Sequence, residues 1–174
     1  LKDKRCVITG AGSGIGRASA LRFAEEGAWV LVSGRSADNT QETVDLVRAA
    51  GGRAEACVAD ATDESGVQAI VQAAMAAFGG LDVFFANAGT PGTNAGLFDQ
   101  TVEEWNDVWR INVLSCMLAV KHAAPPMVAQ QQGSILFTSS AASLRANAGA
   151  ISYSASKAAV NNFAQVAANA LAGT

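Results

Sequence analysis

Residues 9–16 read T-G-A-G-S-G-I-G, and this stretch decides the fold. It follows a short apolar run, residues 6–8, which predicts a strand. It precedes residues 17–26, whose apolar side chains recur at helical spacing. Strand, glycine-rich turn and helix therefore succeed one another. Gly10 permits a tight exit from the strand. Gly14 and Gly16 lack the Cβ that would hold a pyrophosphate, or the packed sheet, at a distance.

Such a turn has two interpretations. It is either a purely structural connection or a dinucleotide site, in which the N–H groups and the dipole of the helix start face the phosphates. A glycine-rich turn alone does not separate them. Its place between a strand and a helix favours dinucleotide binding.

Composition narrows the class of protein. The chain has 174 residues, of which 50% are hydrophobic and 16% charged, which predicts one ordered domain over residues 1–174. The net charge is −3 and no basic stripe occurs, which argues against nucleic acid and membrane surfaces as partners. We expect no apolar run long enough to span a bilayer and no signal peptide. Because the sequence begins without Met, we expect the natural N-terminus to lie further upstream.

The cysteines and the histidine do not suggest a metal or redox centre. Cys6, Cys57 and Cys116 show no C-x-x-C spacing, which favours buried free thiols in the cytoplasm, a reducing compartment. His122 is the only histidine, so no metal site is expected, and a packing or helix-surface role is favoured instead.

Strands and helices alternate along the rest of the chain. Further strands are expected at 28–33, 54–59, 81–86 and 135–138. Helices are expected from a cap at Asp38 or Asn39 to about residue 50, at 64–78, from a capping box at Thr101, and at 153–172. Pro125 and Pro126 are expected to kink or end the helix that begins at Thr101. This order predicts an α/β protein with a doubly wound, Rossmann-type parallel sheet.

The candidate catalytic residues lie in the second half. Tyr153 and Lys157 are four residues apart on a predicted helix, so they share one face. A phenol is a poor acid or base at neutral pH, and a fixed ammonium beside it stabilises the phenolate. By itself the pair is also compatible with two unrelated surface side chains. Ser140 follows the fifth predicted strand, and Asn112 lies in the preceding helix.

Taken together, these motifs resemble the short-chain dehydrogenase/reductase family. The resemblance covers essentially the whole chain and consists of T-G-x-x-x-G-x-G at residues 9–16, Asp60, N-A-G at 87–89, Asn112, Ser140 and Y-x-x-x-K at Tyr153 and Lys157. It implies hydride transfer between a nicotinamide cofactor and a carbonyl or secondary alcohol.

The resemblance also implies residue roles. Tyr153 is the acid/base, Lys157 stabilises its phenolate and holds the nicotinamide ribose, Ser140 contacts the substrate oxygen, and Asn112 supports a proton relay through water. The cofactor-binding residues implied are Gly10, Ser13, Gly14, Ile15, Gly16, Arg35, Asp60, Ala61, Asn87, Ala88, Gly89, Tyr153 and Lys157.

Two features depart from the family pattern. Ala86 stands where many relatives have a first Asn before N-A-G. Relatives also continue beyond the Tyr-Lys helix with two strands, a helix and a loop that covers the substrate. We therefore expect these residues to be the retained part of a longer enzyme with residues 135–138 at a sheet edge. Alone, they are expected to be poorly soluble and nearly inactive.

The cofactor and the oligomer can also be predicted. Gly34 stands where NAD-preferring relatives carry Asp, and Arg35 can meet a 2′-phosphate, so NADP(H) is favoured and NAD(H) remains an alternative. The helices Thr101–Ala124 and Tyr153–Ala172 are expected to form a homodimer or homotetramer interface. Residues 90–98 and 141–152, which carry Leu97, Phe98, Leu144 and Ile151, are expected to form the pocket of a neutral or hydrophobic small-molecule substrate. A dinucleotide-binding regulator and an inactive fragment are the other hypotheses.

Overall fold

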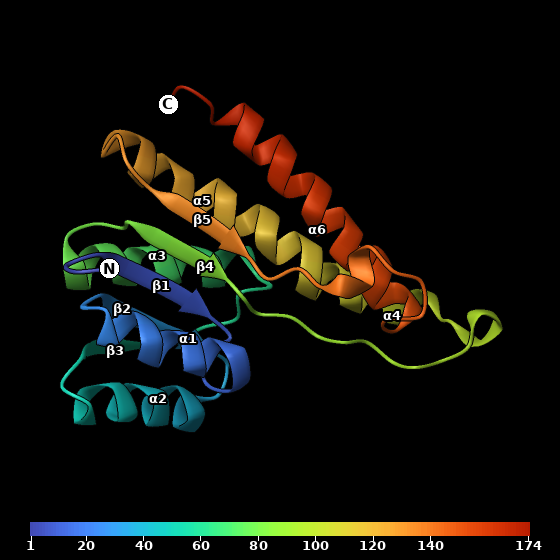
Figure 1. Cartoon of the computed structure of the whole chain (residues 1–174), viewed down its shortest axis with the longest axis horizontal. Helices are drawn as coiled ribbons and strands as arrows, with labels where there is room; N and C mark the ends of the chain where they lie inside the picture. The colour runs from blue at the N-terminus through green and yellow to red at the C-terminus, as the bar shows by residue number, and fades with distance from the viewer.

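The computed structural model describes all residues, 1–174, and shows a five-stranded parallel sheet in the order β3-β2-β1-β4-β5 (Figure 1). The strands are β1 (Arg5–Thr9), β2 (Trp29–Gly34), β3 (Arg53–Val58), β4 (Val83–Ala86) and β5 (Ser134–Phe137). The helices are α1 (Gly14–Glu25), α2 (Ala37–Ala49), α3 (Glu64–Phe78), α4 (Val102–Trp109), α5 (Ser115–Ala129) and α6 (Ile151–Ala170).

Helices cover both faces of the sheet. α1 and α2 pack on one face, and α3, α5 and α6 on the other (Figure 1). The strand order reverses direction at β1, because the chain moves first to β2 and β3 and then to β4 and β5. In open parallel sheets such a reversal leaves a crevice beyond the carboxyl ends of the strands, where ligands bind. The expected doubly wound Rossmann-type fold is confirmed.

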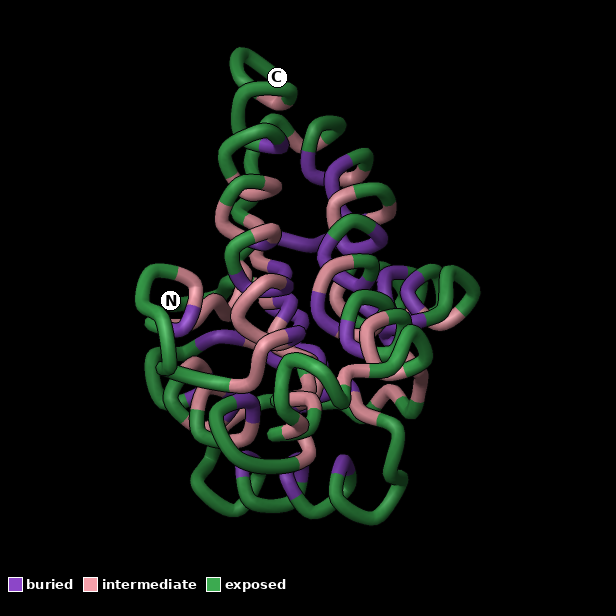
Figure 2. Tube along the Cα trace, turned by 90° about the vertical axis from the view of Figure 1, so that its right-hand side faces the viewer, coloured by how far each residue is buried: buried purple, intermediate pink, exposed green.

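The core consists of two apolar layers, one on each face. Val7, Leu31, Ile70 and Phe84 belong to the larger layer, which lies between the sheet and α3, α5 and α6. The smaller layer includes Ile8 and lies under α1 and α2. Figure 2 shows the buried residues gathered in the middle of the molecule, with exposed residues at the far ends.

A charged pair joins β1 to β4 at the end of the sheet opposite the crevice. Arg5 donates from Nε and Nη2 to the two carboxylate oxygens of Asp82, at 2.7 and 2.8 Å, and its backbone N–H donates to Asp82 Oδ2 at 2.9 Å. These hydrogen bonds lower the pKa of Asp82, although its burial opposes them. Asp82 therefore stays ionised and fixes the register of the two strands.

Some sequence expectations are confirmed and others are corrected. The helix at residues 64–78 has the expected bounds, and Thr101 Oγ1 caps α4 by accepting the N–H of Glu104 at 3.1 Å. The cap of α2 is Ser36 rather than Asp38 or Asn39, since Ser36 Oγ accepts the N–H of Asn39 at 3.3 Å.

The helix that begins after Thr101 does not end at its prolines. It runs to Ala129 and contains a π-helical turn at Arg110–Leu114. Ala123, Ala124 and Met127 are buried around the prolines, so packing holds the helix although two N–H donors are missing.

The apolar character of this helix also differs from expectation. No apolar segment long enough for a membrane was expected, but residues 102–129 pass that test by length and composition alone. The helix packs against α3, α6, β4 and β5, as a core helix does.

Strand β5 forms one edge of the sheet, as expected. Ile135 and Phe137 face the larger core layer, whereas Leu136 is 42% exposed. Beside β5, the helices α5 and α6 enclose a mostly apolar groove of about 440 Å³. One side of β5 is therefore open to pairing.

The three cysteines are free, as expected. Cys6 and Cys116 are buried, and burial raises the pKa of Cys6 to about 12 and that of Cys116 to about 11. Cys57 is only half-buried. His122 lies on the surface of α5, with its Nε2 3.0 Å from Glu64 Oε1.

Candidate functional site

A cleft of about 450 Å³ opens at the carboxyl ends of the strands, beside the neighbouring strands β1 and β4, where the strand order reverses. Most of the candidate residues from the sequence meet there. Its lining includes Gly10, Ser13, Gly14, Ile15, Arg35, Asp60, Ala61, Asn87, Ala88, Gly89, Tyr153 and Lys157. Gly16, Asn112 and Ser140 are not part of this lining.

The glycine turn has the conformation that its residues require. Gly10 and Gly14 have φ angles of +65° and +51°, which L residues rarely adopt. A Cβ on Gly14 would meet no atom within 4 Å, so the turn is open towards the cleft. A Cβ on Gly16 would lie 2.3 Å from Gly10 O and 2.8 Å from Ala11 Cα. Gly16 therefore permits the close packing of α1 on the turn rather than contact with a ligand.

Asn87 joins three strands beneath the cleft. Its Nδ2 donates to Thr9 O at 3.1 Å, and its Oδ1 accepts from Thr138 Oγ1 at 2.9 Å. Thr9 Oγ1 in turn accepts the N–H groups of Asn87 and Ala88, each at 3.1 Å. The ends of β1, β4 and β5 are therefore held in one network, which fixes the floor of the cleft.

Lys157 is buried beside Tyr153. Its Nζ donates to Thr138 O at 2.8 Å and lies 5.6 Å from the centre of the Tyr153 ring. Only 4% of Lys157 is exposed, and this burial lowers its pKa below the ordinary value. A Cβ on Gly89 would lie 3.2 Å from Asn112 Oδ1, so the glycine lets the chain pass close to that buried amide. The expected cation beside the phenol is present.

Asn112 is fully buried in the π-helical turn and makes three side-chain hydrogen bonds. Its Oδ1 accepts the N–H of Thr90 at 2.8 Å, and its Nδ2 donates to Thr90 O at 3.0 Å and to Ser156 Oγ at 2.9 Å. Ser156 Oγ donates to Tyr153 O at 2.7 Å. Asn112 thus connects the segment after β4 to the helix that carries Tyr153 and Lys157.

Ser140 begins a short 3-10 turn, Ala141–Ser143, which packs on α6. Its Oγ accepts the N–H of Ala142 at 3.1 Å. This bond uses an acceptor site of the hydroxyl and not its proton.

The other end of the cleft is polar. Partial burial alone would raise the pKa of Asp60, but hydrogen bonds from Thr62 and the charges of Arg35 and Arg110 lower it below its ordinary value. Arg35 is exposed at the end of β2 and lines the cleft. The neighbouring Ser33 Oγ is buried without a hydrogen-bond partner, although Ser33 lines the cleft.

These features fit a dinucleotide. Phosphate groups can be bound by the glycine turn, which is open at Gly14, and by the N-terminus of the helix that follows it. Ribose hydroxyls can be bound by the unpartnered hydroxyl of Ser33 and by the buried ammonium of Lys157.

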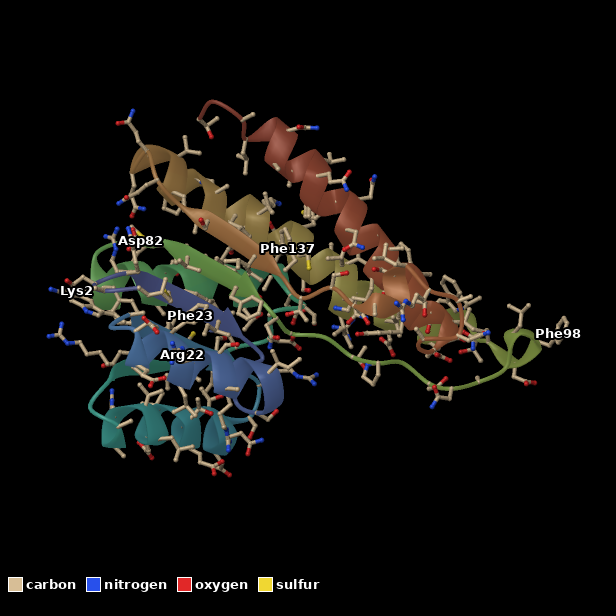
Figure 3. All side chains as sticks on the ribbon, viewed as in Figure 1. Lys2, Arg22, Phe23, Asp82, Phe98 and Phe137 are labelled. Carbon is tan, nitrogen blue, oxygen red and sulfur yellow. The ribbon has the colours of Figure 1, made fainter.

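The segments expected to form the substrate wall lie largely outside the cleft. Of residues 90–98 only Thr90 and Pro91 line it, and none of 141–152 does. Leu97 is 67%, Phe98 98% and Leu144 82% exposed. Figure 3 shows Phe98 at the far tip of its loop, with its side chain directed away from the body of the molecule. This wall is thus not assembled here: Leu97, Phe98 and Leu144 face outward, whereas Ile151, the first residue of α6, is only partly exposed.

Sequence reasoning missed several residues around the cleft. Thr138 contacts both Asn87 and Lys157, and Ser156 contacts both Asn112 and the Tyr153 carbonyl. Thr138 carried one usable signal, because it ends a predicted parallel strand and such ends meet at one edge of the sheet.

Comparison with known proteins agrees with this geometry. The family model for short chain dehydrogenase matches residues 4–174. The chain is 38% identical over 170 residues to 2,5-dichloro-2,5-cyclohexadiene-1,4-diol dehydrogenase of Sphingobium indicum, covering 97% of this chain and 67% of that protein. It is 34% identical over 173 residues to 3-oxoacyl-(acyl-carrier-protein) reductase of Thermotoga maritima, covering 99% and 70%.

Solved structures show the same likeness. A 7α-hydroxysteroid dehydrogenase, complexed with NADH and 7-oxo glycochenodeoxycholic acid, superposes with a TM-score of 0.93 at 35% identity, covering 98% of this chain and 66% of that one. NAD⁺-bound xylitol dehydrogenase gives a TM-score of 0.94 at 33% identity, with the same coverage. The chain spans about two thirds of the length of these relatives. Sequence motifs, cleft and relatives agree that the chain belongs to the short-chain dehydrogenase/reductase family of oxidoreductases.

Proposed function

We propose that this protein interconverts a carbonyl compound and the corresponding secondary alcohol with a nicotinamide cofactor, and that Tyr153 moves the proton. The observation that carries the proposal is the buried Lys157 ammonium, which lies 5.6 Å from the Tyr153 ring in a cleft built on the glycine turn. A regulator that only senses the dinucleotide needs the turn but has no use for this pair.

The residues divide the chemistry as follows. Bound in the cleft, the nicotinamide supplies or accepts the hydride. Tyr153 gives its phenolic proton to the substrate oxygen in reduction and takes a proton in oxidation. Lys157 stabilises the phenolate left behind, because its charge is buried and fixed by Thr138 O.

Ser140 and Asn112 assist this proton transfer. The Ser140 hydroxyl, whose proton is not used by its bond to Ala142, donates to the substrate oxygen as charge develops. Asn112 holds Thr90 and Ser156 in place and supports a relay through water behind Lys157.

We further propose that NADP(H) is preferred over NAD(H). Gly34 has no side chain, so this position offers no carboxylate to the ribose hydroxyls. A side chain would also fit poorly there, because a Cβ on Gly34 would lie 2.9 Å from Thr40 Oγ1. Arg35 lies next to it at the edge of the cleft and can pair bidentately with a 2′-phosphate. The 7α-hydroxysteroid and xylitol dehydrogenases bind NADH and NAD⁺. A comparison of NADPH with NADH in this protein therefore tests the role proposed for Arg35.

A homo-oligomer in the cytoplasm completes the proposal. Large apolar side chains are exposed on the helices expected at the interface, with Trp109 41% and Val166 56% exposed. Ala164 and Ala168 of α6 line the groove beside β5, and Ala168 is exposed there. We infer that a second copy packs on the two helices expected at the interface, Thr101–Ala124 and Tyr153–Ala172. A strictly monomeric mass by light scattering at micromolar concentration would refute the oligomer.

The function is tested by cofactor titration and by turnover on a panel of ketones and secondary alcohols. We expect saturable quenching or enhancement of cofactor fluorescence and a higher kcat/KM with NADPH than with NADH. Arg35→Ala should lower the NADPH value and spare the NADH value. Binding without any turnover would favour the regulator, and no binding would favour the inactive fragment.

A further inference from the structure

The carboxylate of Glu104 does not complete the capping box that its sequence position predicts. In such a box the third residue of the helix bonds back to the N–H of the capping residue. Thr101 makes its half of the motif. Glu104 Oε1 instead accepts the N–H of Thr93 at 3.1 Å and the hydroxyl of Ser152 at 3.1 Å. One carboxylate oxygen therefore joins α4 to two segments that are distant in sequence.

The first of these segments is the start of α6. Ser152 is fully buried, is the second residue of α6 and directly precedes Tyr153. The helix begins without a capping side chain and without an acidic residue in its first turn. A negative charge near a helix start stabilises its unpaired N–H groups. Glu104 supplies that charge from the neighbouring helix α4. Its partner Ser152 directly precedes Tyr153, the proposed acid/base.

The second segment is the base of the loop at residues 90–100. Gly92 has a φ angle of +69°, and a Cβ there would lie 3.0 Å from Ser152 Oγ and 3.1 Å from Val108 Cγ2. Hydrogen bonding from Thr93, and less from Ser152, lowers the pKa of Glu104, so the group is ionised at neutral pH. The loop is therefore held against α6 at its base, while its tip at Phe98 extends away (Figure 3).

A second set of hydrogen bonds between this loop and α6 lies two turns further along the same helix face. Asn112 bonds to Thr90 in the loop and to Ser156 in α6. Glu104, Val108 and Asn112 are spaced by four, so they share one face of the helix. Both polar residues connect the same loop to the same helix, on either side of Tyr153.

We propose that Glu104 is a positioning residue for Tyr153, which locks the first turn of α6 to the base of the 90–100 loop. This inference rests on the proposed role of Tyr153 as acid/base. Glu104 acts through Ser152 and Thr93 and does not line the cleft. The cofactor end of the cleft, around Arg35 and the glycine turn, makes no contact with it.

Four variants of the full chain test the inference. Glu104→Ala removes both bonds, Ser152→Ala removes only the bond to α6, and Glu104→Gln keeps an oxygen that can accept both. Glu103→Ala is the matched control, because Glu103 is the exposed neighbour in the same helical turn. Each is measured for kcat, for substrate KM, for cofactor Kd and for hydrogen exchange of the α6 amides from residue 154 to residue 157.

We expect Glu104→Ala to lower kcat about tenfold to a hundredfold, since a misplacement of about 1 Å has effects of that size. Substrate KM should rise, cofactor Kd should stay near the wild-type value, and the α6 amides should exchange faster. Ser152→Ala should show the faster exchange with a smaller rise in KM. Glu104→Gln should restore most of kcat, and Glu103→Ala should match the wild type.

Unchanged kcat and unchanged exchange in Glu104→Ala would overturn the inference. So would a loss of cofactor affinity equal to the loss of kcat, because that pattern indicates general destabilisation. If the wild type neither binds cofactor nor turns over, the proposed function fails. The link that Glu104 makes between α6 and the loop is then tested by hydrogen exchange of the α6 amides alone. Equal exchange rates in Glu104→Ala and Glu103→Ala would refute it.

Discussion

Gly16→Ala should damage both the stability of the protein and its affinity for the cofactor. Gly16 has no positive φ angle, so the change introduces no backbone strain of that kind. The new methyl would instead lie 2.3 Å from Gly10 O and 2.8 Å from Ala11 Cα. Both are backbone atoms, so the start of α1 has to move away from the turn.

The size of the effect follows from this geometry. Overpacking costs about 1–3 kcal/mol, and a clash with backbone belongs at the upper end, about 3 kcal/mol. For a chain of this length each kcal/mol lowers Tm by about 2–4 °C, so a decrease of about 6–12 °C is expected. A displaced helix start that loses half of this energy in phosphate binding raises the cofactor Kd about tenfold.

Urea unfolding, thermal unfolding and cofactor titration measure the three quantities. Gly51→Ala is the matched control, because Gly51 has a φ angle of +81° and no atom within 4 Å of its Cβ position. It should lose about 1–2 kcal/mol through strain alone, and its cofactor Kd should not change. A Gly16→Ala protein within about 0.5 kcal/mol of the wild type, with normal affinity, would show that the packing argument is wrong.

Three further changes probe other parts of the structure. Asn112→Ala should cost about 2–4 kcal/mol in urea unfolding, because the backbone N–H and C=O of Thr90 lose their side-chain partner and Ser156 Oγ loses the donor that it accepts from; a loss below about 1 kcal/mol would contradict this. Asp82→Asn should destabilise at pH 7. Because the folded pKa of Asp82 is lowered, its contribution is present above the ordinary value of about 4 and is lost as pH falls through the folded value, so the wild type and the variant should converge in acid. If the stabilities of the two proteins converged at high pH instead, the Asp82 carboxylate would not be the stabilising form. Leu136→Lys should reduce aggregation in light-scattering assays by placing a charge on the edge strand, and an unchanged aggregation rate would show that β5 is not the adhesive edge.

Local signals in the sequence predicted the fold well. The end of α3 follows from Gly79, whose left-handed conformation ends the helix. The parallel, doubly wound arrangement follows from the alternation of strands and helices, whereas the order β3-β2-β1-β4-β5 is seen only in the structure. Most of the cleft was predictable too, chiefly through the family resemblance that residues 9–16, 87–89, Tyr153 and Lys157 carry.

Contacts between distant segments were less accessible. The sequence around Glu104 predicts a local capping box, but its partners Thr93 and Ser152 lie in other segments. Pro125 and Pro126 predict a kink or an end, yet the helix continues past them to Ala129, where the surrounding turn is buried. The spacing of the apolar residues in the 90–98 loop likewise does not predict its direction, because these side chains could have faced either the cleft or solvent.

The most direct test of the proposed chemistry is Tyr153→Phe, measured for turnover and for cofactor binding on the same preparation. The phenyl ring keeps the packing beside Lys157 but has no proton to give. We expect kcat to fall about a hundred- to ten-thousandfold, the usual loss for a missing acid/base, while the cofactor Kd stays close to that of the wild type. Turnover by Tyr153→Phe at the wild-type rate would contradict the account.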